Sequence, residues 1–181
     1  MYGMVNRALE DMVCAAHGAE TWEKIKAKAG VEVDLFLSND AYPDEMTYNL
    51  VGAASEILEA PAPVLLEAFG VHWVTRTAAE GYGHLMKAAG TNLKDFLVYL
   101  PNFHTRVNLI FPHLNPPRFL CSDVGENSLK LHYFSDRRGL APFVNGLIQG
   151  LSQYFSTPVE VKQISDWSDA GEHDIFEIRW A

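Results

Sequence analysis

The chain has 181 residues, 48% of them hydrophobic, and a formal net charge of −9, which suits one globular domain with a sizeable core. The negative charge argues against binding to nucleic acids or anionic membranes, because both require basic surfaces. Charges at Arg7, Glu10 and Asp11 come too early for a secretory leader, and no apolar run approaches the roughly 20 residues that span a bilayer. Cys14 and Cys121 are too few for a disulfide framework or a zinc cluster. We expect a soluble, cytoplasmic protein.

The first half of the chain has helical periodicity. Apolar residues recur at spacings of three and four, and Gly30 and Pro61 follow two periodic segments as stop signals. The expected helices are residues 4–17, 20–29, 44–58, 63–77 and 82–88. A longer apolar-striped segment, residues 93–111, contains Pro101, which lacks a backbone N–H and should bend the helix or end its first part.

Beyond Pro116 and Pro117 the pattern changes from helical to alternating. The expected elements are strands at 118–122 and 129–135, a helix at 139–155, and strands at 159–164 and 175–180. The two strand pairs turn around residues 125–127 and Gly171. Helices followed by a strand–strand–helix–strand–strand unit predict an α+β fold with a four-stranded antiparallel sheet.

His104 lies on the apolar stripe of the 93–111 helix. The apolar residues at helical spacing around it include Leu97, Leu100, Val107 and Phe111. An imidazole on such a face must find a hydrogen-bond partner or a metal ion. Two interpretations stay open on this evidence. One is a hydrogen-bonded core histidine, which is the commoner case, and the other is the proximal ligand of a haem iron.

Tyr133, Ser135 and Arg137 alternate along the 129–135 strand and its end. Alternate strand residues share a face, so we expect these three side chains to project together at intervals of about 7 Å. All three are donors, and a guanidinium can bind a carboxylate through two parallel hydrogen bonds. The row suits an anionic ligand with two carboxylates or phosphates. An exposed strand face with ordinary polar residues explains it equally well.

Taken together, these signals resemble the H-NOX family, the haem nitric-oxide and oxygen binding domains related to the sensor region of soluble guanylate cyclase. The resemblance covers essentially the whole chain. It begins with residues 1–3, includes the helix that bears His104, and continues through residues 116–118 to the Tyr-x-Ser-x-Arg motif at 133–137. The combination of this histidine with this motif is specific. The wider pattern is closest to cyanobacterial members.

The resemblance implies a single domain over residues 1–181, with a helical subdomain of about 1–62 and a haem-ligating α+β subdomain of about 63–181. Haem b would lie between the two lobes. His104 matches the proximal iron ligand, and Pro117 matches the residue that pushes the porphyrin out of planarity. The motif residues Tyr133, Ser135 and Arg137 match the side chains that bind the haem propionates.

The distal face of the haem determines which gas is bound. Bound O2 carries negative charge that a buried donor stabilises, whereas NO and CO need this far less. Relatives that bind O2 have a distal tyrosine, and Phe143 aligns with it after a one-residue insertion in residues 138–142. Phenylalanine cannot donate, so we expect NO and CO binding without O2, although Trp73 or Tyr82 could supply a donor. The other residues that the resemblance places around the haem are Met1, Val5, Leu9, Trp73, Leu100 and Leu147.

The sequence leaves three functions open. The first is a non-catalytic gas sensor that signals to a separate protein, a histidine kinase or a cyclic-dinucleotide signalling enzyme. The second is a haem protein that binds O2 or reacts with peroxide, although no distal acid–base group is evident for the latter. The third is a haem-free domain that binds an anionic ligand through Tyr133, Ser135 and Arg137. The resemblance favours the sensor and predicts that the chain is not an enzyme.

Overall fold

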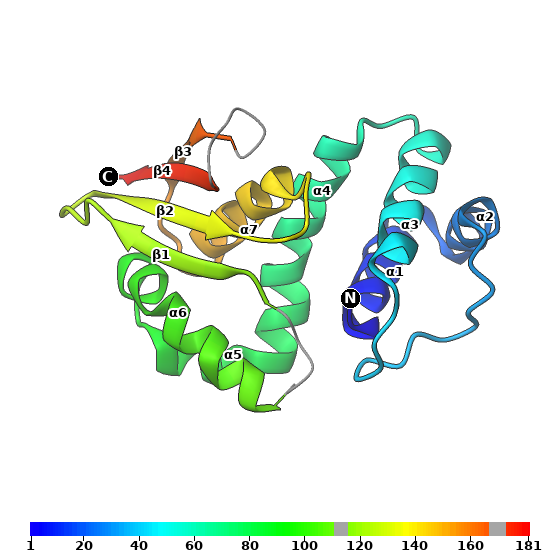
Figure 1. Ribbon diagram of the computed structural model, residues 1–181, viewed down its shortest axis with the longest axis horizontal. Helices are drawn as coiled ribbons and strands as arrows, with labels where there is room; N and C mark the ends of the chain where they lie inside the picture. Colours follow the sequence, from blue (N-terminus) through cyan, green and yellow to red (C-terminus); the bar gives the residue numbers. More distant parts are fainter. Residues whose placement is uncertain (111–115, 167–172) are drawn as a thin grey trace.

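The computed structural model describes residues 1–110, 116–166 and 173–181 (Figure 1). Its elements are α1 (Gly3–His17), α2 (Ala19–Ala29), α3 (Asp44–Ile57), α4 (Ala62–His72), the π-helix η1 (Trp73–Ala78), α5 (Ala79–Ala89), α6 (Leu93–Ile110), β1 (Arg118–Ser122), β2 (Ser128–Phe134), α7 (Ala141–Tyr154), β3 (Val159–Ser165) and β4 (Asp174–Trp180). The predicted α+β class and the order of its elements are confirmed. The predicted helix end at Phe111 and the turn at Gly171 lie outside the described residues.

The largest departure from the predicted helices is between residues 72 and 82. A break was expected after residue 77, but η1 joins α4 to α5 without one, and only Tyr82 leaves helical geometry (φ −133°, ψ 16°). In the described residues no single helix is long and apolar enough to cross a membrane. The segments Asp44–Ile57 and Ala62–Ala89, bent by 114°, reach that length and hydropathy only as a pair.

The sheet has the order β1-β2-β4-β3, with every neighbouring pair antiparallel. In β2, Leu129, Leu131 and Tyr133 are buried while the residues between them are partly exposed, which is the period of two expected for a sheet with one covered face. Residues of α6 and α7 join the inward-facing strand residues in one hydrophobic cluster. One face of the sheet therefore packs on these helices and forms the wall of the core.

The buried residues form two clusters rather than one. The first consists mainly of α1, α2 and α3, and the second of α5, α6, α7 and the sheet. Figure 1 shows these two groups on opposite sides of α4. Phe69 of α4 belongs to the first cluster and Val74 of η1 to the second. The continuous helical segment from α4 into η1 therefore connects the two cores.

Helices α4 and α7 approach so closely that glycine is required at their crossing. A Cβ atom on Gly146 would lie 2.0 Å from the Glu67 carbonyl oxygen, and one on Gly70 would lie 2.3 Å from the Phe143 carbonyl oxygen. Neither backbone atom can yield by the rotation of a side chain. This contact fixes α7 against α4, and with it the relative positions of Leu147 and Trp73.

Helix α6 continues through Pro101, so the prediction that Pro101 could end the helix is wrong. Proline provides no N–H for the carbonyl four residues earlier, which is that of Leu97. The thiol of Cys121 on β1 donates to the Leu97 carbonyl at 3.4 Å. The neighbouring strand thus supplies a donor where the helix itself cannot.

Candidate functional site

His104 lies where α6 meets the beginning of the sheet. Its ring centroid is 5.3 Å from that of Phe119 on β1 and 6.0 Å from that of Phe103. The residue as a whole is only partly buried, but its Nδ1 atom is buried and has no hydrogen-bond partner among the described residues. Burial lowers the pKa of His104 to about 4, so the imidazole is neutral at neutral pH. A core histidine would need the partner that is missing here, and this favours a ligand role.

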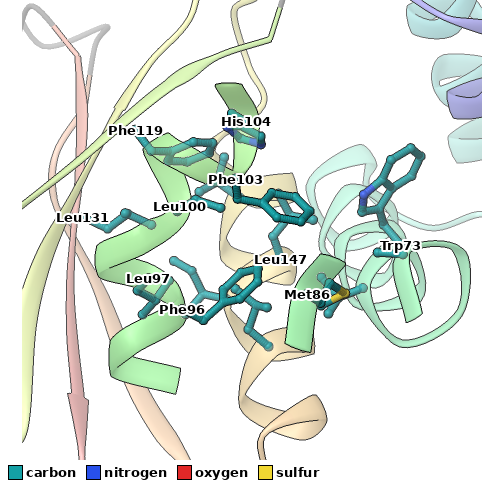
Figure 2. Close-up of a pocket in the computed structure, with 15 residues that line it drawn as sticks. Trp73, Met86, Phe96, Leu97, Leu100, Phe103, His104, Phe119, Leu131 and Leu147 are labelled. Atoms are coloured by element: carbon teal, nitrogen blue, oxygen red, sulfur yellow. The ribbon is translucent and has the colours of Figure 1, made fainter. Parts of the chain in front are cut away.

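A cavity opens beside His104 (Figure 2). The cavity itself has a volume of about 90 Å³. The empty space is about 560 Å³ when the part that is open to solvent is included. Apart from His104 the described lining consists of aliphatic, aromatic and thioether side chains. Such a lining suits a flat apolar ligand held by few polar groups.

The sequence predicted only some of this lining. Trp73, Leu100, His104 and Leu147 were expected and line the cavity. The lining residues that the sequence analysis did not single out include Met86, Phe96, Phe103, Phe119 and Ile148. In Figure 2 Phe103 projects into the space between His104 and Leu147. Nothing in the sequence separates these residues from ordinary core positions, because lining a cavity and filling a core require the same apolar side chains.

Tyr133, Ser135 and Arg137 do not form the straight row that was predicted. Strand β2 ends at Phe134, so only Tyr133 has the strand geometry on which the prediction depended. The Arg137 N–H donates to the Ser135 hydroxyl oxygen at 3.1 Å, a local hydrogen bond that turns the chain away from the strand direction. The three residues remain close together, but around a bend.

Tyr133 connects this bend to His104. Its side chain is buried, and Phe119 lies between the two rings, with its centroid 5.3 Å from that of Tyr133 and 5.3 Å from that of His104. Burial, followed by the nearby Asp174 carboxylate, raises the pKa of the Tyr133 hydroxyl despite its hydrogen bond with Ser135. The phenol therefore stays protonated and able to donate. The two predicted parts of the site meet through Phe119.

Arg137 forms an ion pair that the sequence did not predict. Its Nε atom donates to Asp44 Oδ2 at 2.7 Å, and the amino group of Met1 binds the other oxygen of the same carboxylate. Burial alone would raise the pKa of Asp44, but the hydrogen bonds from Met1 and Arg137 outweigh it and hold this pKa below its ordinary value. In the sequence, Asp44 is explained as a residue at the start of a helix. Nothing in the neighbouring sequence indicates that it also binds Arg137.

The predicted distal residues separate into two groups. Trp73 and Leu147 line the cavity, whereas Val5, Leu9 and Phe143 pack in the cluster around α1 to α3. Phe69, which the prediction did not include, joins the groups: its ring centroid is 5.2 Å from that of Phe143 and 6.2 Å from that of Trp73. The predicted distal residues Trp73 and Phe143 thus belong to an aromatic cluster at the junction of the two cores.

Three other predicted residues lie away from the cavity wall. Met1 lies beside Asp44 and Tyr42 rather than at the cavity. Pro117 is partly buried just before β1, and Tyr82 lies at the kink in α5. Among the described lining residues, neither Pro117 nor Tyr82 appears. In the described residues there is also no group of three or more His, Cys, Asp or Glu side chains that could hold a metal ion directly.

The fold defines the class of protein first. The structure is similar to that of the H-NOX protein from S. oneidensis in the Fe(II)NO state, with a TM-score of 0.90, 21% identity, and coverage of 100% of this chain and 99% of the other. The unliganded Fe(II) H-NOX protein from K. algicida has a TM-score of 0.85 at 22% identity, with 100% and 97% coverage. The architecture is that of H-NOX proteins.

The family then follows from the sequence. Residues 2–163 match the family model described as Haem-NO-binding, and the chain belongs to this family, as predicted. Its relatives include soluble guanylate cyclase gcy-31 of Caenorhabditis elegans, 27% identical over 182 residues, and gcy-37 of the same organism, 29% identical over 187. These matches cover 99% and 98% of this chain but only 26% of each cyclase, so the chain corresponds to about a quarter of either relative.

Proposed function

We propose that this chain is a haem-based gas sensor. His104 would hold haem b, whose iron would bind NO or CO and hold O2 poorly, and the chain would signal to a separate protein without catalysis of its own. One observation carries the proposal: a neutral imidazole with a buried, unpartnered nitrogen stands in the wall of an apolar cavity. Membership of the Haem-NO-binding family supports the same reading.

His104 in the cavity wall, and the polar residues that Phe119 connects to it, fit a haem in their chemistry. His104 offers a neutral nitrogen donor, which is the form that binds iron. Tyr133 and Ser135 offer hydroxyl donors and Arg137 offers a guanidinium, which match the two carboxylates of a haem b. A haem needs more than the 90 Å³ of the cavity, so side chains such as Phe103 must turn aside to admit it. When bound, the iron supplies the site for a diatomic gas.

The apolar distal side supports selectivity for NO and CO. In the described lining, the only side chain with an N–H or O–H donor apart from His104 is that of Trp73, and the Phe143 ring, which packs against Phe69, carries no polar atom. Losing one buried donor to a charged acceptor costs on the order of 1.5–3 kcal/mol, roughly tenfold to a hundredfold or somewhat more in O2 affinity. A stable Fe(II)–O2 spectrum in air-equilibrated buffer would overturn this part.

The response to gas would pass between the two cores. We propose that His104 would hold the haem and that Pro117 would contact it, and that gas binding at the iron would shift the helical lobe relative to the sheet lobe. Such a shift requires only a few kcal/mol of differential affinity between two packings. A cytoplasmic histidine kinase or cyclic-dinucleotide signalling enzyme would then bind the altered surface.

The deciding experiment is an absorption spectrum of the reduced protein with haem, before and after NO, with air as the control. We expect a Soret band that shifts with NO, is lost or altered in His104→Ala, and is restored by added imidazole. His84→Ala, which removes an exposed histidine on α5, is the matched control and should leave the spectrum unchanged. If the wild-type protein takes up no haem, the alternative of a haem-free domain that binds an anionic ligand replaces this proposal.

A further inference from the structure

Helix α3 contacts the segment after β2 at two points. Asp44 Oδ2 accepts from Arg137 Nε at 2.7 Å, and the Tyr48 hydroxyl donates to the Arg138 backbone carbonyl at 3.0 Å. Asp44 and Tyr48 are four residues apart and so lie on one face of the helix. Their partners are consecutive residues, 93 and 90 positions further along the chain. One face of α3 therefore holds both the Arg137 side chain and the backbone carbonyl of the next residue, Arg138.

The second contact matters because the first is weak alone. An ion pair between partly exposed groups contributes little, and an arginine side chain has several rotatable bonds. Side-chain exposure is 23% for Arg137 and 35% for Asp44. Two contacts fix the backbone from which Arg137 projects: the Ser135 hydroxyl accepts from the Arg137 N–H at 3.1 Å, and Tyr48 binds the carbonyl on the other side. The guanidinium thus starts from a backbone that is held on both sides.

The environment of Tyr48 suits it to this task. The residue is 38% exposed, so its hydroxyl is in place for this bond and not for core packing. Burial of the hydroxyl, followed by the Asp44 carboxylate, raises the pKa of Tyr48 against the opposite influence of Arg137. The hydroxyl therefore remains a donor throughout the neutral and mildly alkaline range. It is also close enough to Tyr133 to influence the pKa of that phenol.

We propose that Tyr48 is a positioning residue for the carboxylate-binding side chains. Its hydroxyl holds the Arg138 peptide so that the Arg137 guanidinium stays directed between Asp44 and a bound carboxylate. The identification of that carboxylate as a haem propionate rests on the proposed function. The effect of Tyr48 on the position of Arg137 does not depend on that function.

The test uses Tyr48→Phe, which removes only the hydroxyl. Tyr99→Phe is the matched control, because Tyr99 lies on α6 and not on α3. Its ring packs under Arg106, whose Cζ atom is 5.4 Å from the ring centroid. The first readout is the exchange with water of the Arg137 Nε–H signal in nitrogen-15 NMR spectra, assigned by its disappearance in Arg137→Lys. Tyr48→Phe should speed this exchange by about two- to tenfold, the range for one lost hydrogen bond, and Tyr99→Phe should not.

The second readout is the rate of haem transfer to apomyoglobin. Tyr48→Phe should raise it by about two- to tenfold in the wild-type background and leave it unchanged in an Arg137→Ala background, because Tyr48 acts through Arg137. An unchanged Nε–H exchange rate overturns the proposal, and so does an equal acceleration of haem loss with and without Arg137. If the wild-type protein binds no haem, the proposed function fails while the NMR readout still decides the role of Tyr48.

Discussion

The thiol of Cys121 donates to the backbone carbonyl of Leu97 at 3.4 Å, across the boundary between β1 and α6. The carbonyl is the one that Pro101 leaves without its helical donor. Burial raises the pKa of Cys121 to about 11, so the sulfur keeps its proton and remains a donor at neutral pH. A single cysteine thus lets α6 continue past a proline and bring His104, one turn further on, to the cavity.

Removal of this thiol should destabilise the protein only while Pro101 is present. We expect Cys121→Ala to lower the free energy of unfolding by about 1 kcal/mol or more, the cost of an unpaired buried carbonyl together with lost sulfur packing. In a Pro101→Ala background the loss should be smaller, because alanine restores the N–H that Leu97 needs. Urea titrations of the four proteins measure the coupling. Equal losses in both backgrounds would show that the hydrogen bond contributes nothing.

Gly146 should tolerate no side chain. A Cβ atom there would lie 2.0 Å from the Glu67 carbonyl, so Gly146→Ala must push α7 away from α4, and we expect a loss of about 3 kcal/mol or more. Gly52 on α3 is the control, since a Cβ there meets nothing within 4 Å, and Gly52→Ala should stabilise the protein by up to about 1 kcal/mol. Thermal unfolding compares the two. A wild-type melting temperature for Gly146→Ala would mean that the helices do not cross so closely.

Asp44 should contribute to stability against acid. Its pKa is below the ordinary value of 3.8 in the folded protein, so the unfolded chain binds the proton more readily. The stabilisation is complete above pH 3.8 and is lost as the pH falls through the lowered pKa. Asp44→Asn should therefore be less stable than wild type at pH 6, with a difference that narrows towards pH 2. Asp34→Asn, in an exposed loop, is the control and should give no such convergence.

The imidazole of His132 should make stability depend on pH in the same direction as Asp44 does, but at higher pH. His132 Nδ1 and His173 Nε2 are 2.7 Å apart, a distance at which one proton is shared, and His132 Nε2 is 2.7 Å from the Ser122 hydroxyl. Burial, followed by repulsion from His173, lowers the pKa of His132 from 6.5. The contribution to stability is therefore full above pH 6.5 and is lost as the pH falls through the lowered value.

His132→Gln tests this assignment, because glutamine keeps a polar group but cannot take up a proton. Wild type should lose more stability between pH 7 and 5 than the variant does. Burial also lowers the pKa values of His72 and His104, but these histidines contribute equally to both proteins. His84→Gln, at an exposed position of α5, should follow the wild-type curve. Parallel curves for wild type and His132→Gln would contradict the assignment.

The sequence by itself determined most of the secondary structure and the donor groups of the candidate site. Apolar spacing of three and four residues, then of two, encodes which face of each element is buried, and this is a local property. For the same reason the helices, the two strand pairs and the position of His104 on an apolar stripe were predictable. The residue types of the Tyr-x-Ser-x-Arg motif likewise identify its hydrogen-bond donors. The motif does not show that the strand ends at Phe134.

Only the tertiary structure decided how these parts combine. Asp44 and Arg137 are 93 residues apart, and Phe119 lies between His104 and Tyr133 because β1 packs against α6. Such contacts depend on how whole helices and strands pack together. The sequence around a residue therefore does not show that the residue makes such a contact. Asp44 looks like a helix start, and Phe119 looks like any buried strand residue. Their roles exist only where distant segments meet.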